Sequence, residues 1–505
     1  MERPPNIPHN VDLLIVGGGI NGVGIARDAA GRGLKVLLCE KDDLGAATSS
    51  ASSKLIHGGL RYLEQYEFRL VAEALAEREV LLKSAPHIVH PMRFVMPHVP
   101  ELRPAWMIRV GLVLYDYLAR RQTLPGSHGV RLTRSQYGAG LKPGLSKGFV
   151  YSDCWVDDAR LVVANARAAA DLGATIVTRT ACISARRSGG RWRVTLRADD
   201  GTQTEIVAEA LANAAGPWVK QLLAETLRQP TTFNLKLVKG SHIVVPRLYE
   251  GDHAFILQND DRRVVFAYSY EQHYTLIGTT DIEVTGAPGP CAASPEEVNY
   301  LCRAANRYFA RQVKESDVVW SFCGIRPLFD DGSANPSAIT RDYVLRVDGD
   351  TTTAPVLSVF GGKITTYRKL AEHALAQLAP WFSQMKNAWT AGTPLPGGDL
   401  AGVSFNQFAS VHFQRDFPWL PEPLRGALAR RHGADAYKVL GNAMSLADLG
   451  EPFGADLYAR EVDYLIEREW ARTAEDVLWR RTKAGLHLTP SEQQAVARYV
   501  AQRAR

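Results

Sequence analysis

A glycine-rich turn near the start of the chain has a spacing that binds dinucleotides. Gly17-Gly-Gly-Ile-Asn-Gly22 fits G-x-G-x-x-G and follows the apolar run Val11–Val16. Such glycines let the backbone approach a pyrophosphate at a helix N-terminus, and Glu40, after the next apolar run, offers its carboxylate to ribose hydroxyls. Because a carboxylate would repel a 2′-phosphate, FAD or NAD is expected rather than NADP. The residues expected to bind it are Gly17, Gly19, Gly22 and Glu40. The alternative is a glycine-rich structural turn.

Small hydroxyl residues follow Glu40 in the stretch 47–62, which reads ATSSASSKLIHGGLRY. Side chains as small as Thr48, Ser49 and Ser53 let a second long ligand lie against the backbone, as the ribityl chain and ring of a flavin require. A nicotinamide cofactor has no evident need for this stretch. The pattern therefore favours FAD; a solvated serine-rich loop would explain the hydroxyls but not the ordered His57-Gly-Gly that follows.

Two later turns are suited to close over the same cofactor. Asn213-Ala-Ala-Gly216-Pro-Trp follows a predicted strand, as expected where the chain returns beside the adenosine half. Phe360-Gly361-Gly362-Lys363-Ile-Thr365 joins a strand to a helix, so its backbone N–H groups and the helix dipole would face the charge that a reduced flavin carries. Either turn alone is compatible with ordinary turn chemistry.

Together these segments resemble a known family. The stretches 47–60, 239–242, 278–281, 324–327 and 361–363 resemble motifs of FAD-dependent glycerol-3-phosphate dehydrogenases, aerobic membrane-associated members of the D-amino-acid-oxidase-like flavoprotein superfamily. Gly-x-Arg-Pro alone occurs across the superfamily, and the stretch 48–66 narrows the match. The similarity runs from residue 12 to at least residue 380, and the remainder resembles the helical domain of that family.

The resemblance implies a reaction. It is oxidation of sn-glycerol 3-phosphate to dihydroxyacetone phosphate by hydride transfer to noncovalent FAD, with electrons passed on to a membrane quinone. Two alternatives stay open. One is an oxidase acting on glycerol 3-phosphate or an amino acid and using O₂, and the other is a flavin-binding protein without catalysis.

That reaction needs a cationic clamp for the phosphate and a proton acceptor for the C2 hydroxyl. Arg61, Arg326 and Lys363 lie in glycine-flanked loops beside the cofactor motifs, although surface salt bridges are the usual role of such residues. His57 is the preferred base and His242 the second choice, because histidine titrates near neutral pH. The candidate orienting groups are Tyr62, Thr279 and Asp281. No metal site is predicted.

The elements that must position these residues alternate along the chain. Val11–Val16, a small-residue helix and Lys35–Cys39 form a predicted βαβ unit. Further strands are expected at 174–178, 191–196, 206–211, 242–245, 263–268, 274–277 and 355–359, and helices at 68–82 and 364–378. Strands far from the first unit indicate a cofactor domain built from discontinuous segments.

The expected fold class is therefore mixed α/β. It is a flavoprotein of the two-dinucleotide-binding-fold type, with an antiparallel-sheet substrate domain and a helical C-terminal domain. The FAD-binding segments are placed at 1–86, 151–225 and 321–389, a substrate-domain and membrane-contact segment at 87–150, and the substrate sheet at 226–320. A Pro/Gly linker at 390–402 precedes the helical domain at 403–505.

Composition sets the remaining bounds. The 505 residues suggest two or three domains, and a net charge of +6 argues only weakly for anionic partners, so nucleic acid is not suggested. The six cysteines lack C-x-x-C spacing and are interpreted as reduced thiols of a cytoplasmic protein. A homodimer is compatible with the sequence.

No stretch reaches the roughly 18 to 20 apolar residues that span a bilayer. Any membrane contact is then peripheral, on the inner face of the cytoplasmic membrane. The segment 105–119, AWMIRVGLVLYDYLA, predicts a helix on which Arg109 and Asp116 share one azimuth and most of the rest is apolar. It is either an interfacial helix or one buried in the substrate domain.

Overall fold

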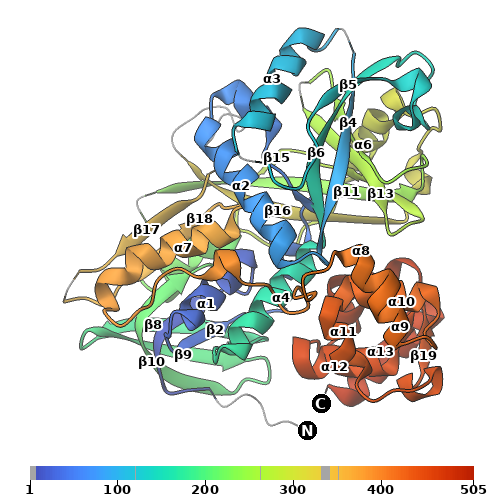
Figure 1. The fold of residues 1–505 in the computed structure, drawn as a ribbon. Helices are drawn as coiled ribbons and strands as arrows, with labels where there is room; N and C mark the ends of the chain where they lie inside the picture. Colours follow the sequence, from blue (N-terminus) through green and yellow to red (C-terminus); the bar gives the residue numbers. More distant parts are fainter. Residues whose placement is uncertain are drawn as a thin grey trace.

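The computed structural model describes residues 7–99, 101–119, 121–231, 233–261, 263–330, 342–350 and 352–504. Figure 1 shows a lower-left part with α1 and β10, an upper part with β6, β11 and α3, and a lower-right part formed by the C-terminal helices. No helix among the described residues is long and apolar enough to cross a membrane.

The first sheet has β1 (Asn10–Val16) near its centre. Leu13, Leu14 and Ile15 are fully buried, as expected for a parallel strand covered on both faces. The strand order is β17-β18-β10-β1-β2-β7, with β8 and β9 continuing antiparallel from β10. The other strands are β2 (Val36–Cys39), β7 (Thr175–Val177), β8 (Thr180–Ser188), β9 (Arg191–Ala198), β10 (Gln203–Asn213), β17 (Val344–Asp348) and β18 (Val356–Phe360).

Three helices from distant parts of the chain cover one face of this sheet. They are α1 (Ile20–Gly31), α4 (Asp158–Asp171) and α7 (Tyr367–Leu378), and they share one hydrophobic cluster with β1 and β2. On the other face Trp192 of β9 is fully buried against β1 and β10. The sheet is thus assembled from segments separated by more than 300 residues of sequence, because β10 pairs with both β1 and β18.

The second sheet has ten strands and is mainly antiparallel. Its ten strands run β15-β11-β14-β13-β12-β4-β6-β3, with β16 beside β11 and β5 beside β6. Pairing is antiparallel except between β12 and β4. The strands are β3 (Leu55–Ile56), β4 (Val89–Pro97), β5 (His128–Arg131), β6 (Lys147–Val156), β11 (Asn234–Pro246), β12 (Ala254–Gln258), β13 (Val264–Tyr270), β14 (Tyr274–Gly278), β15 (Ile282–Val284) and β16 (Trp320–Asp330).

Helices cover both faces of the second sheet. α6 (Pro295–Tyr308) packs on the face that carries Ile243, Val245 and Ile277. α2 (Phe68–Ser84) and α3 (Ala105–Tyr117) pack on the face that carries Val244, Tyr268 and Leu276. α5 (Val219–Gln221) is a short turn after β10.

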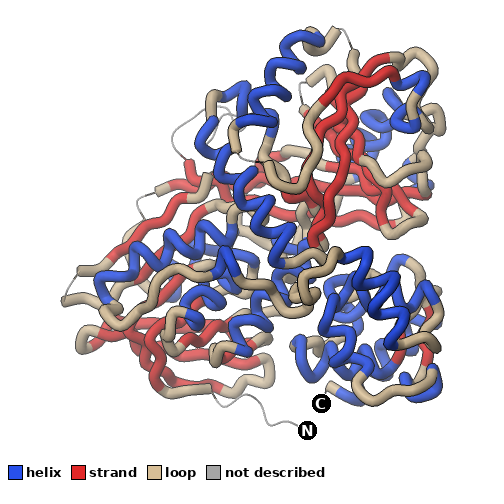
Figure 2. The backbone as a smooth tube through the Cα atoms, in the orientation of Figure 1, coloured by secondary structure: helices blue, strands red, loops and turns tan. Residues whose placement is uncertain are grey.

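The C-terminal part is almost entirely helical (Figure 2). Its helices are α8 (Phe405–Gln407), α9 (Phe413–Asp416), α10 (Glu422–His432), α11 (Ala436–Leu440), α12 (Ala459–Glu469) and α13 (Pro490–Arg503), with a small hairpin of β19 (Pro452–Gly454) and β20 (Leu457–Tyr458). Thr473 and Asp476 cap each other before a π-helical turn, Asp476–Arg481.

Buried ion pairs join this helical part to the first sheet. Asp43, just beyond β2, receives Arg481 at 2.6 Å and Arg480 at 2.6 Å. Arg160 of α4 pairs with Glu469 of α12. Because Asp43 and Arg481 are almost completely buried, each charge depends on the other for compensation.

The interpretation of all six cysteines as reduced thiols is wrong for two of them. Cys291 and Cys323 form a disulfide that ties the segment before α6 to β16. Cys39, Cys154 and Cys302 are buried free thiols and Cys182 is a half-buried one. Sequence spacing could not reveal the pair, because only the return of the chain from α6 to β16 brings the two positions together.

Candidate active site

A cavity of about 550 Å³ lies between the two sheets. The turns after β1, β2, β10 and β18 line one side, and the middle parts of β11 and β16 with the turn after β14 line the other. Turns at the carboxyl ends of parallel strands meet at one edge of a sheet, which is where ligands bind in open α/β folds. The fold therefore brings the cofactor motifs of distant segments to one place.

The glycine turn after β1 leaves room that a side chain would fill. Gly17 has φ +116°, and a Cβ there would lie 2.4 Å from the carbonyl oxygen of Ala214. A Cβ on Gly22 would lie 1.9 Å from the carbonyl oxygen of Gly17, so Gly22 packs behind the turn and does not line the cavity. α1 begins after Gly19 without a side-chain cap from that residue or an acidic residue in its first turn. The N–H of Ile20 donates to Ser49, and the next N–H groups and the helix dipole suit a pyrophosphate.

Glu40 holds this turn from the adjacent strand. Its carboxylate accepts hydrogen bonds from the backbone N–H of Gly18 at 2.6 Å and of Asp42 at 2.8 Å. Burial raises the pKa of Glu40 despite these two bonds. A carboxylate has about four lone-pair sites, so acceptor capacity remains for ribose hydroxyls.

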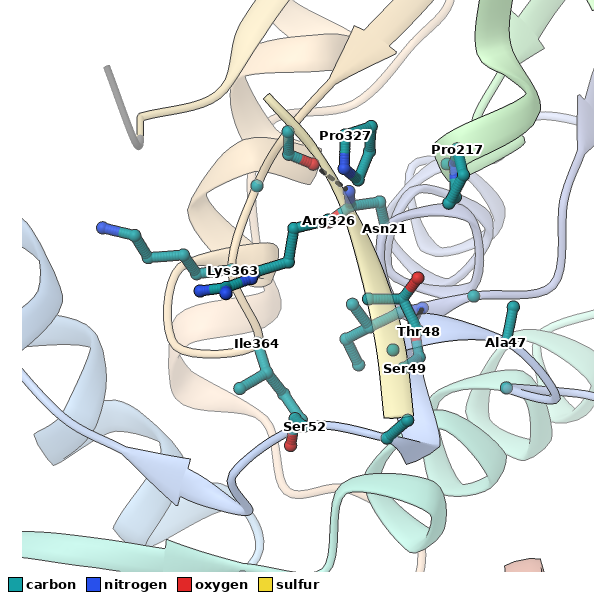
Figure 3. A pocket seen from close by; sticks show the side chains of 18 of the residues that line it. Asn21, Ala47, Thr48, Ser49, Ser52, Pro217, Arg326, Pro327, Lys363 and Ile364 are labelled. Atoms are coloured by element: carbon teal, nitrogen blue, oxygen red, sulfur yellow. Dashed lines mark hydrogen bonds between the residues drawn. The ribbon is translucent and has the colours of Figure 1, made fainter. Parts of the chain in front are cut away.

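The hydroxyl-rich stretch is fixed by its own side chains. Thr48 donates to the carbonyl of Ile325 at 2.6 Å, and Ser49 accepts from the N–H of Ile20 at 3.0 Å. Ser53 and the Nε2 atom of His242 are 2.9 Å apart. The stretch therefore connects α1 to β11 and β16, and Figure 3 shows Thr48 and Ser49 beside the cavity.

Tyr115 of α3 supports the segment that carries His57. Its hydroxyl accepts from the N–H of Gly58 at 2.8 Å and donates to Asp153 at 2.7 Å. Arg78 of α2 in turn pairs with Asp153 at 2.6 Å. Burial raises the pKa of Tyr115 well above its usual value, so the hydroxyl keeps its proton. No sequence motif identifies this support, because its members come from three separate elements.

His242 lies on the cavity side of β11 and is almost completely buried. Its ring stacks on Phe322 at 4.8 Å between centroids. Burial, with further effects of Lys54 and Arg326, lowers the pKa of His242 to about 3. Gly278 of β14 is the cross-strand partner of His242. A Cβ on Gly278 would lie 2.0 Å from the ring, so only glycine leaves space for the histidine.

The three cations predicted for the phosphate clamp all line the cavity. Arg326 forms an ion pair with Asp281, and the Nζ atom of Lys363 lies 4.1 Å from the centroid of the Tyr62 ring. Arg61 makes no side-chain hydrogen bond or ion pair with any described residue. In Figure 3, Arg326 and Lys363 come from different elements and extend in the same direction.

Most of the residues singled out from the sequence line this one cavity. They are Gly17, Gly19, Glu40, Thr48, Ser49, Ser53, His57, Arg61, Tyr62, Gly216, His242, Thr279, Asp281, Arg326, Gly361, Gly362, Lys363 and Thr365. Sequence reasoning missed Asn21, whose side chain donates to the carbonyl of Gly361 at 3.1 Å (Figure 3). It also missed Arg263, which precedes β13, and Phe266 of β13, and no motif marks either residue.

The donors present fit FAD. Gly361 and Gly362 have φ values of +70° and +91°, which residues with side chains rarely adopt. They present their backbone to the cavity just before α7. At the other end, the Nζ atom of Lys41 lies 4.8 Å from the centroid of the Trp218 ring, beside Glu40, where the adenosine half is expected. The glycine turn after β1 lies between these two ends. A long cofactor can therefore span from Glu40 to Gly361.

Comparison with known protein families agrees with this geometry. A family described as FAD dependent oxidoreductase matches residues 12–368, and the C-terminal domain of alpha-glycerophosphate oxidase matches residues 388–504. Together the two models extend over nearly the whole chain.

Individual proteins are similar over nearly their full length. A glycerol-3-phosphate dehydrogenase of Pseudomonas aeruginosa is 56% identical, over 97% of this chain and 94% of its own. A D-erythritol 1-phosphate dehydrogenase of Brucella abortus is 53% identical, over 97% of each chain. The crystal structure of the glycerol-3-phosphate dehydrogenase of Bacillus halodurans complexed with FAD has a TM-score of 0.74 at 26% identity, and the match covers 98% of this chain and 94% of that one.

Proposed function

The chain belongs to the family of FAD-dependent glycerol-3-phosphate dehydrogenases and uses FAD, and from this membership we propose that it oxidises sn-glycerol 3-phosphate at C2 to dihydroxyacetone phosphate. The electrons then pass to a quinone dissolved in the membrane. Bound FAD supplies the acceptor for the hydride that leaves C2.

The observation that carries this proposal is the gathering of Arg61, Arg326 and Lys363 on one cavity beside His57. Guanidinium groups bind phosphate through paired, charge-assisted hydrogen bonds, so the arginines hold the substrate and orient C2. His57 takes the proton of the C2 hydroxyl at an imidazole nitrogen. Its backbone N–H lies 3.3 Å from Thr365 Oγ1, and Tyr115 holds the next residue, so the position of the ring is supported from two sides.

Anaerobic addition of sn-glycerol 3-phosphate to the purified yellow protein tests the reaction. We expect the flavin absorbance to bleach and dihydroxyacetone phosphate to form in equal amount. Absence of bleaching by phosphorylated polyols would contradict the proposal. Rapid peroxide formation when air is admitted would instead favour an oxidase.

D-erythritol 1-phosphate is a second candidate substrate. The similarity to a dehydrogenase of that name, at 53% identity, is close to the 56% of the Pseudomonas aeruginosa protein, so overall identity does not separate the two. Both substrates carry a phosphate and a secondary alcohol, which the same clamp and base would serve. The ratio of kcat/KM for the two compounds decides between them.

The proposed quinone acceptor requires a membrane contact, for which the outer face of α3 is suited. Tyr117 is 79% exposed, Trp106 68% and Val110 52%, and Met107, Val113 and Leu114 are also exposed. Ile108, Leu112 and Tyr115 face inward and are buried. The expected burial of the segment 105–119 in the protein therefore holds for one face of the helix, and the exposed apolar face supports the proposal of an interfacial contact. We infer peripheral attachment to the inner face of the cytoplasmic membrane.

Several charged residues on and beside this helix contact other parts of the protein. Arg109 and Asp116 both bind Ser127, so their shared azimuth faces a protein loop. Arg103 pairs with Glu64 and Gln258 rather than pointing to solvent, and residue 120 lies outside the described residues. Attachment would thus depend mainly on the apolar face.

Flotation with vesicles that contain phosphatidylglycerol tests the attachment. Val110→Glu with Leu114→Glu should abolish flotation and leave FAD content and activity with a soluble dye unchanged. Val411→Glu with Met444→Glu is the matched control, because these residues are 56% and 79% exposed on the C-terminal domain. Equal flotation of both double variants would rule out α3 as the contact.

A further inference from the structure

A buried carboxylate lies behind one wall of the cavity. Glu297 is in the first turn of α6, is 2% exposed and does not line the cavity. The wall in front of it consists of Gly240, His242, Thr279, Asp281 and Arg326, and is called the substrate wall below. α6 packs on the opposite face of the second sheet from His242.

The Glu297 carboxylate accepts hydrogen bonds on both oxygens. Its Oε1 atom lies 2.8 Å from the hydroxyl of Ser241 and 2.8 Å from that of Thr280. Its Oε2 atom lies 2.7 Å from the Nζ atom of Lys239 and 2.9 Å from the N–H of Ser294, with which Glu297 forms a capping box. The same group therefore caps α6 and anchors two segments of the second sheet.

These bonds keep the carboxylate ionised. Burial opposes the charge, but Lys239, the N–H of Ser294 and the two hydroxyls outweigh it and hold the pKa of Glu297 below its ordinary value. An ionised carboxylate only accepts, so Ser241 and Thr280 must both donate to it. The Thr280 oxygen then remains available to accept from the N–H of Ser241 at 2.9 Å. Glu297 thus leaves the Thr280 oxygen as the acceptor in the hydrogen bond from the Ser241 N–H, and this bond links β11 to the turn after β14.

Each anchored residue is next in sequence to the substrate wall. Successive side chains of a strand point to opposite faces, so Ser241 meets α6 while His242 faces the cavity. Thr280 stands between Thr279 and Asp281, and its carbonyl lies 3.4 Å from the guanidinium of Arg326. A displacement of Ser241 or Thr280 would therefore be transmitted to the histidine and to the Asp281–Arg326 pair.

The substrate wall is tightly packed at two glycines. A Cβ on Gly240 would lie 2.6 Å from the Thr279 hydroxyl, and a Cβ on Gly278 would lie 2.0 Å from the ring of His242. The two segments are in contact without an intervening side chain. Their relative position is then set by what holds them from behind.

We propose that Glu297 is a positioning residue for the reaction. It holds the substrate wall in register with the cofactor side of the cavity through Ser241 and Thr280. The inference rests on the proposed function, because it assigns a role within the same site.

The contact of Glu297 with the substrate wall and its role in the cap of α6 can be tested separately. Thr280→Val keeps the shape of the side chain and removes the bond to Oε1, together with the acceptor of the Ser241 N–H. Ser294→Ala removes only the hydroxyl that accepts from the N–H of Glu297 and caps α6, and leaves the bond from the Ser294 N–H to the carboxylate. Glu297→Ala removes both. Glu296→Gln is the matched charge control, because Glu296 is the preceding, exposed residue of the same helix.

The readouts are KM and kcat for sn-glycerol 3-phosphate, the affinity for inorganic phosphate measured by thermal shift, and FAD content. Misplacement of about 1 Å can reduce rates a hundredfold. Thr280→Val and Glu297→Ala should raise KM and the Kd for phosphate on the order of tenfold at full FAD content. Ser294→Ala and Glu296→Gln should stay within about twofold.

Two outcomes would overturn the assignment. One is wild-type KM and phosphate affinity in folded Thr280→Val protein. The other is an equal loss in Ser294→Ala, which would mean that Glu297 acts only through the helix cap. If Glu297→Ala does not fold, Thr280→Val still decides the question. If the wild-type protein is not reduced by sn-glycerol 3-phosphate, the proposed function fails, but the phosphate affinities still test the positioning role.

Discussion

The two histidines that face the cavity differ in their surroundings. The ring of His242 is buried, stacked on Phe322 and adjacent to Ser53, and its pKa is lowered to about 3. A general base works best when its pKa lies near the operating pH, so His242 is poorly suited at pH 7. His242 is better explained as a neutral hydrogen-bonding group, and His57 stays the proposed base.

Replacement of His57 should affect chemistry more than binding. His57→Gln keeps a hydrogen-bonding side chain but cannot take up a proton, so flavin reduction should slow by about 10² to 10⁴. Stopped-flow reduction under anaerobic conditions measures the rate and the substrate Kd together. His412→Gln, in the C-terminal domain, is the control. An unchanged reduction rate would exclude His57 as the base.

The phosphate clamp makes a different prediction. Arg61→Ala and Arg326→Ala each remove a charge-assisted hydrogen bond worth about 1.5 to 3 kcal/mol, so kcat/KM for sn-glycerol 3-phosphate should fall about ten- to hundredfold. Activity toward glycerol should hardly change, because glycerol lacks the phosphate. Arg134→Ala, on the exposed surface, should match the wild type. Equal loss with both substrates would refute the clamp.

Residue types with a motif could be identified from sequence, and residues without one could not. Gly17, Glu40 and His57 were expected at one site because their spacing has a chemical meaning along the chain, and all three line the cavity. Tyr115 and Glu297 act through hydrogen bonds to residues dozens of positions away. No local pattern distinguishes them from an ordinary tyrosine or glutamate.

At the scale of elements, strands were predicted where apolar runs were clear. The expectations at 206–211 and 274–277 correspond to β10 and β14, and the helix at 68–82 to α2. α3 was ambiguous because a helix with one buried face and one exposed apolar face has the composition of a core helix.

The segment 390–402 shows another limit of composition. It contains prolines and glycines, yet Leu395 is 2% exposed and its N–H binds the carbonyl of Ser84.

The disulfide gives an element-scale prediction. The Cys291–Cys323 bond closes a loop with a sequence separation of 32, which should contribute about 3 to 4 kcal/mol to the free energy of unfolding. A reductant should therefore lower the Tm of the wild type but not that of the double variant Cys291→Ser with Cys323→Ser. Identical sensitivity to reductant in both proteins would contradict the bond.

At the scale of the whole molecule, the helical part is joined to the cofactor side by buried charges. Asp43→Asn leaves Arg481 without its buried partner, which should cost about 3 to 5 kcal/mol and loosen the loop after Glu40. We expect a lower Tm and faster release of FAD, measured by flavin fluorescence. Lys438→Gln breaks an exposed pair of the same domain and should cost less than about 1 kcal/mol. Similar effects of the two substitutions would show that burial of the pair is unimportant.

Buried histidines also set the response of stability to acid. Burial, together with Arg430, lowers the pKa of His90 to about 4, compared with about 6.5 in an unfolded chain. Between these values the unfolded state binds more protons, so stability falls as the pH is lowered through this window, by about 1.4 kcal/mol per pH unit. His90→Phe retains the stacking on Trp155 and should flatten this part of the curve of Tm against pH. An unchanged slope would contradict this assignment.

The pairing of β1 with β10, and of β10 with β18, has a consequence for the order of events during synthesis. The first glycine turn leaves the ribosome early, but its neighbouring strands follow only after residues 203–213 and 356–360 have been made. Arg481, the partner of Asp43, is made 438 residues later, which takes on the order of 20 to 90 seconds at ordinary elongation rates. A nascent chain therefore carries an incomplete nucleotide site for most of its translation. Cofactor uptake should be a late step that completes the molecule, and chains truncated before residue 356 should emerge without flavin.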